Sequence, residues 1–201
     1  MASLVTRIVN KLLSRPPVSP ADELIRQGHL RVGQSCDLSA MSVFIPDKVP
    51  GNLNIEIGDN CCIRGSLVLY RKTSKIRIGN NVYIGPGTLL ECVEEIEIGN
   101  DVLISTNCNI IDTNSHSVHS QERIADTVDW QKGLAHKNWD VVDSRKISIG
   151  NHCWLGLRSI LLKGVSLAEG TIVAAGSVVT KSTEAFTVVA GNPAQFIRKA
   201  D

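Results

Sequence analysis

The stretch ISIGNHCWLGLRSILLKGVSLAEGTIVAAGSVV, residues 147–179, places an aliphatic side chain at every sixth position. A period of six is typical of a parallel β-helix, in which each six-residue unit forms one side of a triangular coil. A β-sandwich would instead place its turns every 8–12 residues. The period therefore predicts a β-helix, and its aliphatic column consists of Ile149, Leu155, Leu161, Leu167, Val173 and Val179.

The same period runs through the first half of the chain, with a small insertion after every third unit. Glycine and Asx residues follow several of the aliphatics, as in IGDN (57–60) and IGNN (78–81), and both tolerate the dihedral angles of tight corners. Three units make one coil, so the sequence predicts an all-β chain of about six coils. The aliphatic positions here are Val32, Leu38, Phe44, Ile57, Ile63, Leu69, Ile78, Ile84, Leu90, Ile98, Ile104 and Ile110.

A second column stands two residues before each aliphatic and contains aliphatic or small residues. Residues i and i−2 of a strand point to the same side, so both columns face one narrow interior. Cys36, Cys61, Cys108 and Cys153 belong to this second column. We predict that they are packing residues rather than metal ligands or disulfide partners, and we expect no metal site.

Residues 112–146 interrupt the ladder. Long irregular connections inside a compact domain are uncommon and usually functional. This one contains His116 and His119, and it also contains Trp130 and Trp139, two of the eight aromatic residues. We therefore predict an extruded loop, 112–146, that carries chemistry.

The two ends of the chain differ from the β-helix, which is expected over residues 31–190. We expect residues 1–30 to form a helical segment, in which LVTRIVNKLLSR (4–15) is amphipathic. That first helix either packs on the end of the coils or on a partner subunit, or associates weakly with a membrane surface. A second short helix has Ser19 as its N-cap and stops at Gly28. Residues 191–201 predict a turn and a short helix.

Composition excludes several classes of function. The chain has 201 residues, of which 43% are hydrophobic, and a net charge of +1, so we expect no nucleic-acid partner. No apolar run is long enough to span a membrane, and the N-terminus lacks the apolar block of a secretory signal. We therefore expect a cytoplasmic protein with reduced thiols.

Three motifs add a family resemblance to the ladder: IGNHCWLG (149–156), VAAGSVVTKS (173–182) and VVAGNPAQFIRK (188–199). Together they resemble the hexapeptide-repeat acyltransferases, in particular the maltose and galactoside O-acetyltransferase type and the polysaccharide-biosynthesis acetyltransferases. The resemblance runs from about residue 30 to the C-terminus. It implies a left-handed β-helix, a homotrimer with shared active sites, and acetyl-coenzyme A as co-substrate. The period alone leaves the handedness open.

The resemblance also implies site residues. His116, in DTNSHSVH (112–119), matches the catalytic histidine of the family and would act as a general base. Asp112 either orients that imidazole or caps the turn where the loop leaves the coils. On the donor side, Trp154 and Ala175 match positions along the thioester and pantetheine arm. The residues that match the nucleotide end of coenzyme A are Thr180, Lys181 and Arg198.

The acceptor site departs from the sugar-binding relatives, which carry an Asn and an Asp where this chain has Gly85 and ECVEE (91–95). Glu91 or Glu94 is a candidate substitute, and Trp130 and Trp139 are candidates to stack on a sugar. The family resemblance alone implies the O-acetylation of a sugar hydroxyl in cell-surface polysaccharide biosynthesis.

Three alternatives stay open at this stage. The first is N-acetylation of an amino sugar, because the same base serves to deprotonate an ammonium group. The second is a γ-carbonic-anhydrase-like metalloprotein on the same scaffold, although His116 and His119 are spaced differently from the pair in that family. The third is a trimeric scaffold without catalytic activity.

Overall fold

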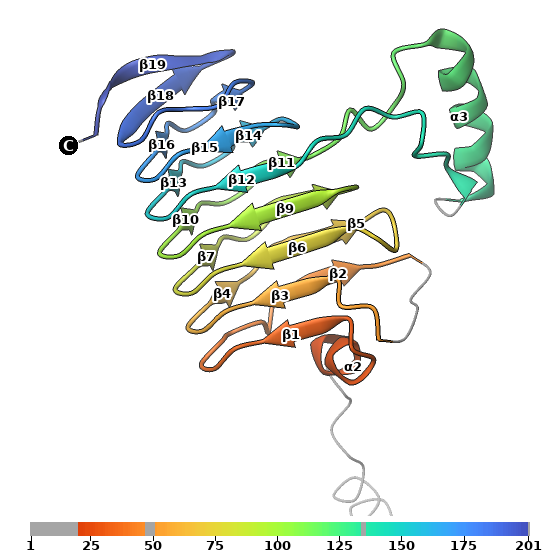
Figure 1. Ribbon diagram of the computed structural model, residues 1–201, viewed down its shortest axis with the longest axis horizontal. Helices are drawn as coiled ribbons and strands as arrows, with labels where there is room; N and C mark the ends of the chain where they lie inside the picture. The colour runs from red at the N-terminus through yellow and green to blue at the C-terminus, as the bar shows by residue number, and fades with distance from the viewer. Residues whose placement is uncertain (1–19, 47–50, 134–135, 201) are drawn as a thin grey trace, which may run out of the picture.

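The computed structural model describes residues 20–46, 51–133 and 136–200, which form a parallel β-helix with three faces (Figure 1). Face A contains β1 (Leu30–Val32), β3 (Ile55–Ile57), β6 (Lys75–Ile78), β9 (Glu95–Ile98), β12 (Ile147–Ile149) and β15 (Ser166–Leu167). Face B contains β4 (Cys62–Ile63), β7 (Tyr83–Ile84), β10 (Leu103–Ile104), β13 (Trp154–Leu155), β16 (Ile172–Val173), β18 (Thr187–Gly191) and β19 (Ala194–Lys199). Face C contains β2 (Ser42–Phe44), β5 (Ser66–Leu69), β8 (Leu89–Cys92), β11 (Asn109–Ile111), β14 (Ile160–Leu161) and β17 (Val178–Val179).

The aliphatic ladder fills the interior, as predicted. From Ile57 to Val179, every ladder residue is at most 4% exposed. Burial of this apolar column is the main favourable contribution to folding. Cys61, Cys108 and Cys153 are also buried, and Cys36 is half-buried against the same core. Among the described residues, all six cysteines are free thiols.

The corner between faces A and B explains the recurring IGN pattern. The side-chain oxygen of Asn100 accepts a hydrogen bond from the main-chain N–H of Asn80 at 2.8 Å, and Asn151 accepts one from Asn100 at 2.8 Å. Each corner side chain therefore accepts a hydrogen bond from a main-chain N–H group at the corner of the preceding coil. A Cβ atom at Gly79 would lie 2.6 Å from the carbonyl oxygen of Gly99, which excludes any larger residue there.

The first coil departs from the predicted ladder. Phe44 is 44% exposed, whereas Ile45 is buried. In the register of face C, Phe44 pairs with outward-facing Val68 and Val43 pairs with buried Leu67. The prediction that Phe44 lies in the core was therefore wrong by one residue, and a shift of one residue reverses the face on which a side chain lies.

At the N-terminal end, α2 (Pro20–Arg26) packs on the first coil through the buried Leu24. It ends as predicted at Gly28, where φ is +80°. The N–H of Gly28 donates to Ile25 and that of His29 to Leu24, the pattern of a Schellman motif. The predicted first helix over 4–15 lies outside the described residues.

The C-terminal end is a β-hairpin, where the sequence predicted a turn followed by a short helix. Strand β18 continues face B, and β19 pairs with it in antiparallel orientation. Because the last coil leaves the edge of β18 unpaired, a returning strand satisfies hydrogen bonds that a helix would not.

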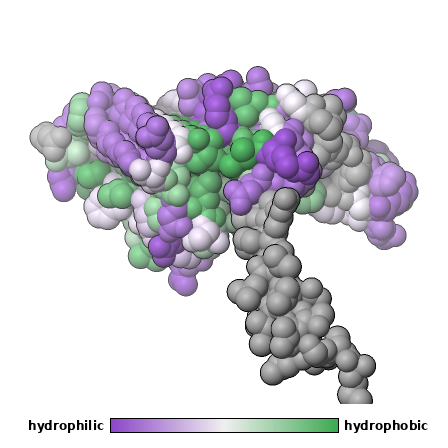
Figure 2. All heavy atoms as spheres, turned by 90° about the horizontal axis from the view of Figure 1, so that it is seen from below, coloured by the Kyte–Doolittle hydropathy of each residue, from purple (hydrophilic) through white to green (hydrophobic). Residues whose placement is uncertain are grey.

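Figure 2, viewed from below, shows hydrophobic residues gathered between hydrophilic ones on the outer surface.

The extruded loop leaves after β11 and returns before β12, so it coincides with the predicted range 112–146. It contains a helix that the sequence did not predict, α3 (Ser120–Lys132), which projects away from the coils (Figure 1). Of the helices in the described ranges, none is both long and apolar enough to cross a membrane.

Candidate active site

The two legs of the loop pair with each other where they leave the β-helix. Thr113 and Ser144 form an antiparallel bridge. The N–H of Asn114 donates to the carbonyl of Asp143 at 2.9 Å, and the N–H of Arg145 donates to the carbonyl of Asp112 at 2.8 Å. This short ribbon fixes the direction in which the segment that contains His116 leaves the coils.

Asp112 is fully buried at the base of this ribbon. Its two carboxylate oxygens accept the main-chain N–H groups of Val93 at 2.7 Å and Glu94 at 2.8 Å. Burial raises the pKa of Asp112 to about 6, although these two hydrogen bonds act in the opposite direction. The geometry therefore favours the capping role of Asp112, and the hypothesis that it orients His116 is not supported, because another carboxylate contacts the imidazole.

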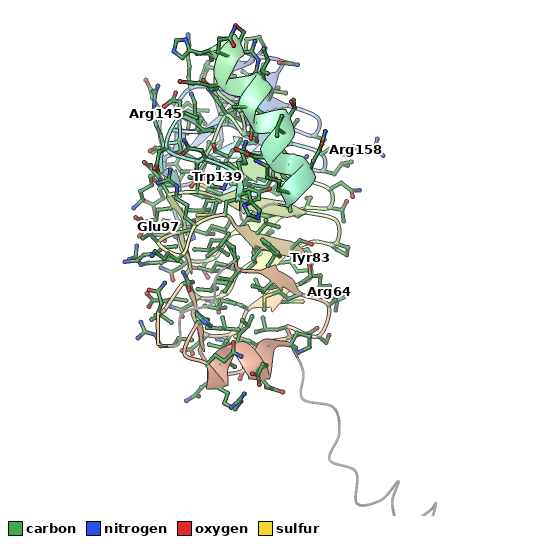
Figure 3. All side chains as sticks on the ribbon, turned by 90° about the vertical axis from the view of Figure 1, so that its right-hand side faces the viewer. Arg64, Tyr83, Glu97, Trp139, Arg145 and Arg158 are labelled. Carbon is green, nitrogen blue, oxygen red and sulfur yellow. The ribbon has the colours of Figure 1, made fainter. Side chains whose placement is uncertain are left out.

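An aromatic contact fastens the returning leg to the coils. Trp139 is only 7% exposed and stacks on Tyr70 with a ring separation of 4.4 Å. Figure 3 shows Trp139 beside α3, at the place where the loop meets the coils. The Tyr70 hydroxyl in turn donates to Glu91. Trp139 therefore has no free face for a sugar, which corrects that prediction, and Glu91 already has a partner.

The other two acceptor candidates lie on the surface. Trp130 is 44% exposed on α3, and Glu94 is exposed at the base of the loop. His119 is the N-cap residue of α3, but its side chain makes no capping hydrogen bond. Trp130 and Glu94 are thus the predicted acceptor residues that remain accessible.

His116 is half-exposed on the outgoing leg of the loop, and its ring contacts α3. Its Nδ1 atom contacts Oδ2 of Asp126, and the same oxygen pairs with Nζ of Lys137. A carboxylate only accepts hydrogen bonds at neutral pH, so Nδ1 of a neutral imidazole paired with it is the protonated nitrogen. Within the described residues Nε2 has no hydrogen-bond partner, so its lone pair is available as a base.

Asp126 stays ionised in this arrangement. Its burial acts to raise the pKa, but the hydrogen bonds and charges of Lys137 and His116 outweigh burial and lower it. The segment around the histidine is held by Ser117, whose hydroxyl donates to Glu122 and whose carbonyl accepts from Arg123 at 2.9 Å. This pair could not be recognised from the sequence, because Asp126 and Lys137 lie 10 and 21 residues after His116.

The outer surface of face B carries the predicted donor residues. In register, Tyr83, Leu103, Trp154, Ile172 and Val188 form one outward column, and Arg198 pairs with Val188 at its end. Leu103 is 54% and Trp154 50% exposed. A cavity of about 410 Å³ on this surface is lined by Ser105, Trp154, Gly156, Leu157, Ile172, Val173, Ala174, Ala175, Val188 and Arg198.

This cavity brings together three of the five predicted donor residues, Trp154, Ala175 and Arg198. Lys181 instead lines a second cavity of about 420 Å³ at the end of the coils, and Thr180 is exposed and lines neither cavity. None of the loop residues that the structure describes, 112–133 and 136–146, lines the cavity at Trp154, so His116 lies outside this cavity. Within the described ranges, no three His, Cys, Asp or Glu side chains are grouped closely enough to bind a metal ion.

Comparison with known proteins is consistent with this architecture. The family model described as the hexapeptide repeat of succinyl-transferase matches residues 146–181. Galactoside O-acetyltransferase of Escherichia coli (strain K12) is 30% identical over 143 residues, which is 71% of this chain and 63% of that protein. "Putative colanic acid biosynthesis acetyltransferase WcaF" of the same strain is 31% identical over 128 residues, 61% of this chain and 69% of that protein.

Solved structures share the fold. A mutant of AntD, an N-acyltransferase from Bacillus cereus, superposes with a TM-score of 0.68 at 24% identity over 91% of this chain and 90% of that chain. Galactoside acetyltransferase in complex with coenzyme A gives a TM-score of 0.55 at 22% identity over 98% and 78% of the two chains. The fold is the left-handed parallel β-helix of these acyltransferases.

The chain belongs to the hexapeptide-repeat acetyltransferase family. Its match spans 63% of the galactoside enzyme and 56% of a Staphylococcus aureus (strain MRSA252) relative, less than two thirds of the length of either.

Proposed function

We propose that this protein is an acetyl-coenzyme A-dependent O-acetyltransferase that acts on a sugar hydroxyl in cell-surface polysaccharide biosynthesis, in the cytoplasm. The observation that carries the proposal is His116, whose Nδ1 is paired with Asp126 and whose Nε2 has no partner among the described residues. The named activities of two relatives, galactoside O-acetylation and colanic acid biosynthesis, support a sugar acceptor and a hydroxyl nucleophile.

In the proposed reaction, the acceptor hydroxyl attacks the thioester carbonyl carbon while Nε2 of His116 takes the hydroxyl proton. The carbon–sulfur bond then breaks, and the imidazolium returns the proton to the departing thiolate. The products are the acetyl ester and coenzyme A. A positioned base of this kind contributes about 10²–10⁴-fold to the rate, and holding the two substrates together supplies much of the remainder.

The donor would lie along the column on face B. The apolar surface at Trp154 suits the acyl and pantetheine portions, and Arg198 at the end of the column suits a phosphate. Ala175 lines the cavity, and its main-chain N–H has no hydrogen-bond partner among the described residues, so we propose that it donates to an amide carbonyl of the pantetheine arm. Lys181 and Thr180 stay proposed contacts of the nucleotide end.

We further propose a homotrimer in which each active site is shared between subunits. Face B exposes an apolar column, whereas the outward column of face A is charged, with Arg31, Glu56, Arg77 and Glu97 in register. An apolar column of this kind is suited to burial against another subunit. A neighbouring chain could thus bring the loop and its His116 to the cavity at Trp154, which no described residue of the chain's own loop lines.

The test is a turnover screen with acetyl-coenzyme A across oligosaccharides, nucleotide sugars and amino sugars. We expect a hydroxyl acceptor, and a loss of about 10²-fold or more in turnover for His116→Ala with unchanged coenzyme A binding. Transfer only to amino sugars would replace the O-acetyl assignment by N-acetylation. Near-normal turnover by His116→Ala would remove this residue from the mechanism.

A further inference from the structure

Lys137 is a buried cation beside the proposed base. Its side chain is 0% exposed, and its Nζ lies 3.5 Å from Nδ1 of His116. The ammonium group lies 4.8 Å from the ring centroid of Trp139 and 5.7 Å from that of Trp130. Burial of a charge is costly unless the charge is paired, and two aromatic rings with one carboxylate satisfy that requirement here.

One oxygen serves both cationic partners. Oδ2 of Asp126 pairs with Lys137 and with His116, whereas Oδ1 is buried and has no hydrogen-bond partner in the described structure. The carboxylate is thus shared between the Lys137 ammonium group and the imidazole. Its effect on the imidazole is weaker than that of an isolated carboxylate, because the ammonium group neutralises part of its charge and also repels the imidazolium form.

We propose that Lys137 is a positioning residue that acts through Asp126 to set the basicity and the orientation of the His116 ring. This inference rests on the proposed role of His116 as the general base. The lysine fixes the carboxylate, the carboxylate fixes the Nδ1–H tautomer, and the pair of charges keeps the imidazole from being held as imidazolium. The function of the buried cation is therefore to keep Nε2 unprotonated and ready to accept a proton.

No other charged side chain in the described ranges pairs with the ring. On α3, Asp126 contacts the ring, Glu122 and Arg123 contact Ser117, and Asp129 pairs with Lys132. On the returning leg, Lys137 contacts the His116 ring, and Asp143 pairs with Arg145 and Lys163. Among the described residues, the charged groups in contact with the imidazole are thus one carboxylate and one ammonium group.

The test follows the His116 ring by NMR titration of ¹³C-labelled histidine in the intact protein, with the His116→Ala spectrum assigning its signal. Lys137→Met removes the cation but keeps a chain of similar length, so the titration midpoint should rise by on the order of one pH unit. Asp126→Asn removes the anion, so the midpoint should fall by a similar amount. The double variant should return close to wild type, because both opposing charges are gone.

Two controls accompany these variants. Lys137→Arg keeps the charge and should keep a midpoint near that of wild type. Lys132→Met removes a half-exposed lysine that pairs with Asp129 on the same helix, and it should change nothing. Circular dichroism and thermal melting establish that each variant is folded. If Lys137→Met does not fold, Asp126→Asn alone still decides the direction in which the titration midpoint of His116 moves.

Kinetics provide a second readout. The acidic limb of the kcat/KM profile should move with the NMR midpoint, and kcat should fall about tenfold or more in Asp126→Asn with little change in KM for acetyl-coenzyme A. Midpoints that stay within about 0.3 units of wild type in both single variants, or that move in the same direction, would overturn the proposal. Because the NMR titration needs no turnover, that failure is distinct from the failure of His116 as a base, which the His116→Ala assay reports.

Discussion

At the scale of single residues, Asp112 connects the loop to the coil below it. Its carboxylate accepts two main-chain N–H groups from residues 93 and 94, and its own carbonyl accepts from the returning leg. A buried acceptor with these partners is expensive to remove, because two donors then lose their hydrogen bonds. The residue therefore acts on the site through the geometry of the loop.

The raised pKa of Asp112 predicts a pH dependence of stability. Its folded value of about 6 lies above the ordinary 3.8, so the folded state binds the proton more tightly. The associated stability is fully present below pH 3.8 and is lost as the pH rises through about 6. We expect the difference in unfolding free energy between wild type and Asp112→Asn to fall by about 2 kcal/mol from pH 4 to pH 7. Urea denaturation followed by circular dichroism measures it, and a difference that is independent of pH would contradict the assignment.

Much of the residue pattern was predictable, for a simple reason. Each coil repeats the environment of the one below, so Ile104 and Leu161 had to be core residues once the period was recognised. Phe44 lies on β2, which is the edge strand of face C and pairs with one neighbour only. The register predicted for Phe44 was therefore wrong by one residue. His116 was identified through its family motif, whereas Asp126 and Lys137 meet it only because the loop folds back on itself.

At the scale of elements, the loop 112–146 is a folded unit. The helix α3 has no buried residue, and its apolar side chains Ile124 and Val128 are 58% and 48% exposed. Because a helix with no buried face shows no clear apolar stripe, the sequence did not reveal it. The order of the loop comes instead from its docked residues, Trp139 and Val142, which pack with Val93 and Tyr70.

This docking predicts a matched pair of variants. Trp139→Ala removes the ring that stacks on Tyr70 and covers Lys137, so the loop should loosen while the coils stay folded. We expect faster amide hydrogen exchange within 112–146 and a loss of about tenfold or more in turnover, since the base is no longer held in place.

The exposed Trp130→Ala serves as the control for this prediction. It should leave exchange in the loop close to wild type, because only a more distant contact with Lys137 is removed. Equal loosening by the two variants, or no loosening by Trp139→Ala, would show that Trp139 does not anchor the loop.

At the scale of the whole molecule, the β-helix separates two halves of the proposed chemistry. The base lies on a loop that leaves after face C, and the donor cavity lies on the outer surface of face B. In the closed oligomer that we propose, a rotation would place the loop of one chain on the cavity of the next. The repeat predicted the scaffold from the sequence, whereas the proposed sharing of the site came from the family resemblance and not from the repeat.

The most direct test of this account is complementation between two inactive variants. One is His116→Ala, which lacks the base, and the other is Trp154→Ala/Arg198→Ala, which lacks two residues of the donor cavity. Both are denatured together in equal amounts and refolded, and mixed trimers are verified by mass. If each site combines the loop of one chain with the cavity of its neighbour, random trimers recover about a quarter of the wild-type sites. Verified mixed trimers that stay as inactive as the two parents would contradict the shared site.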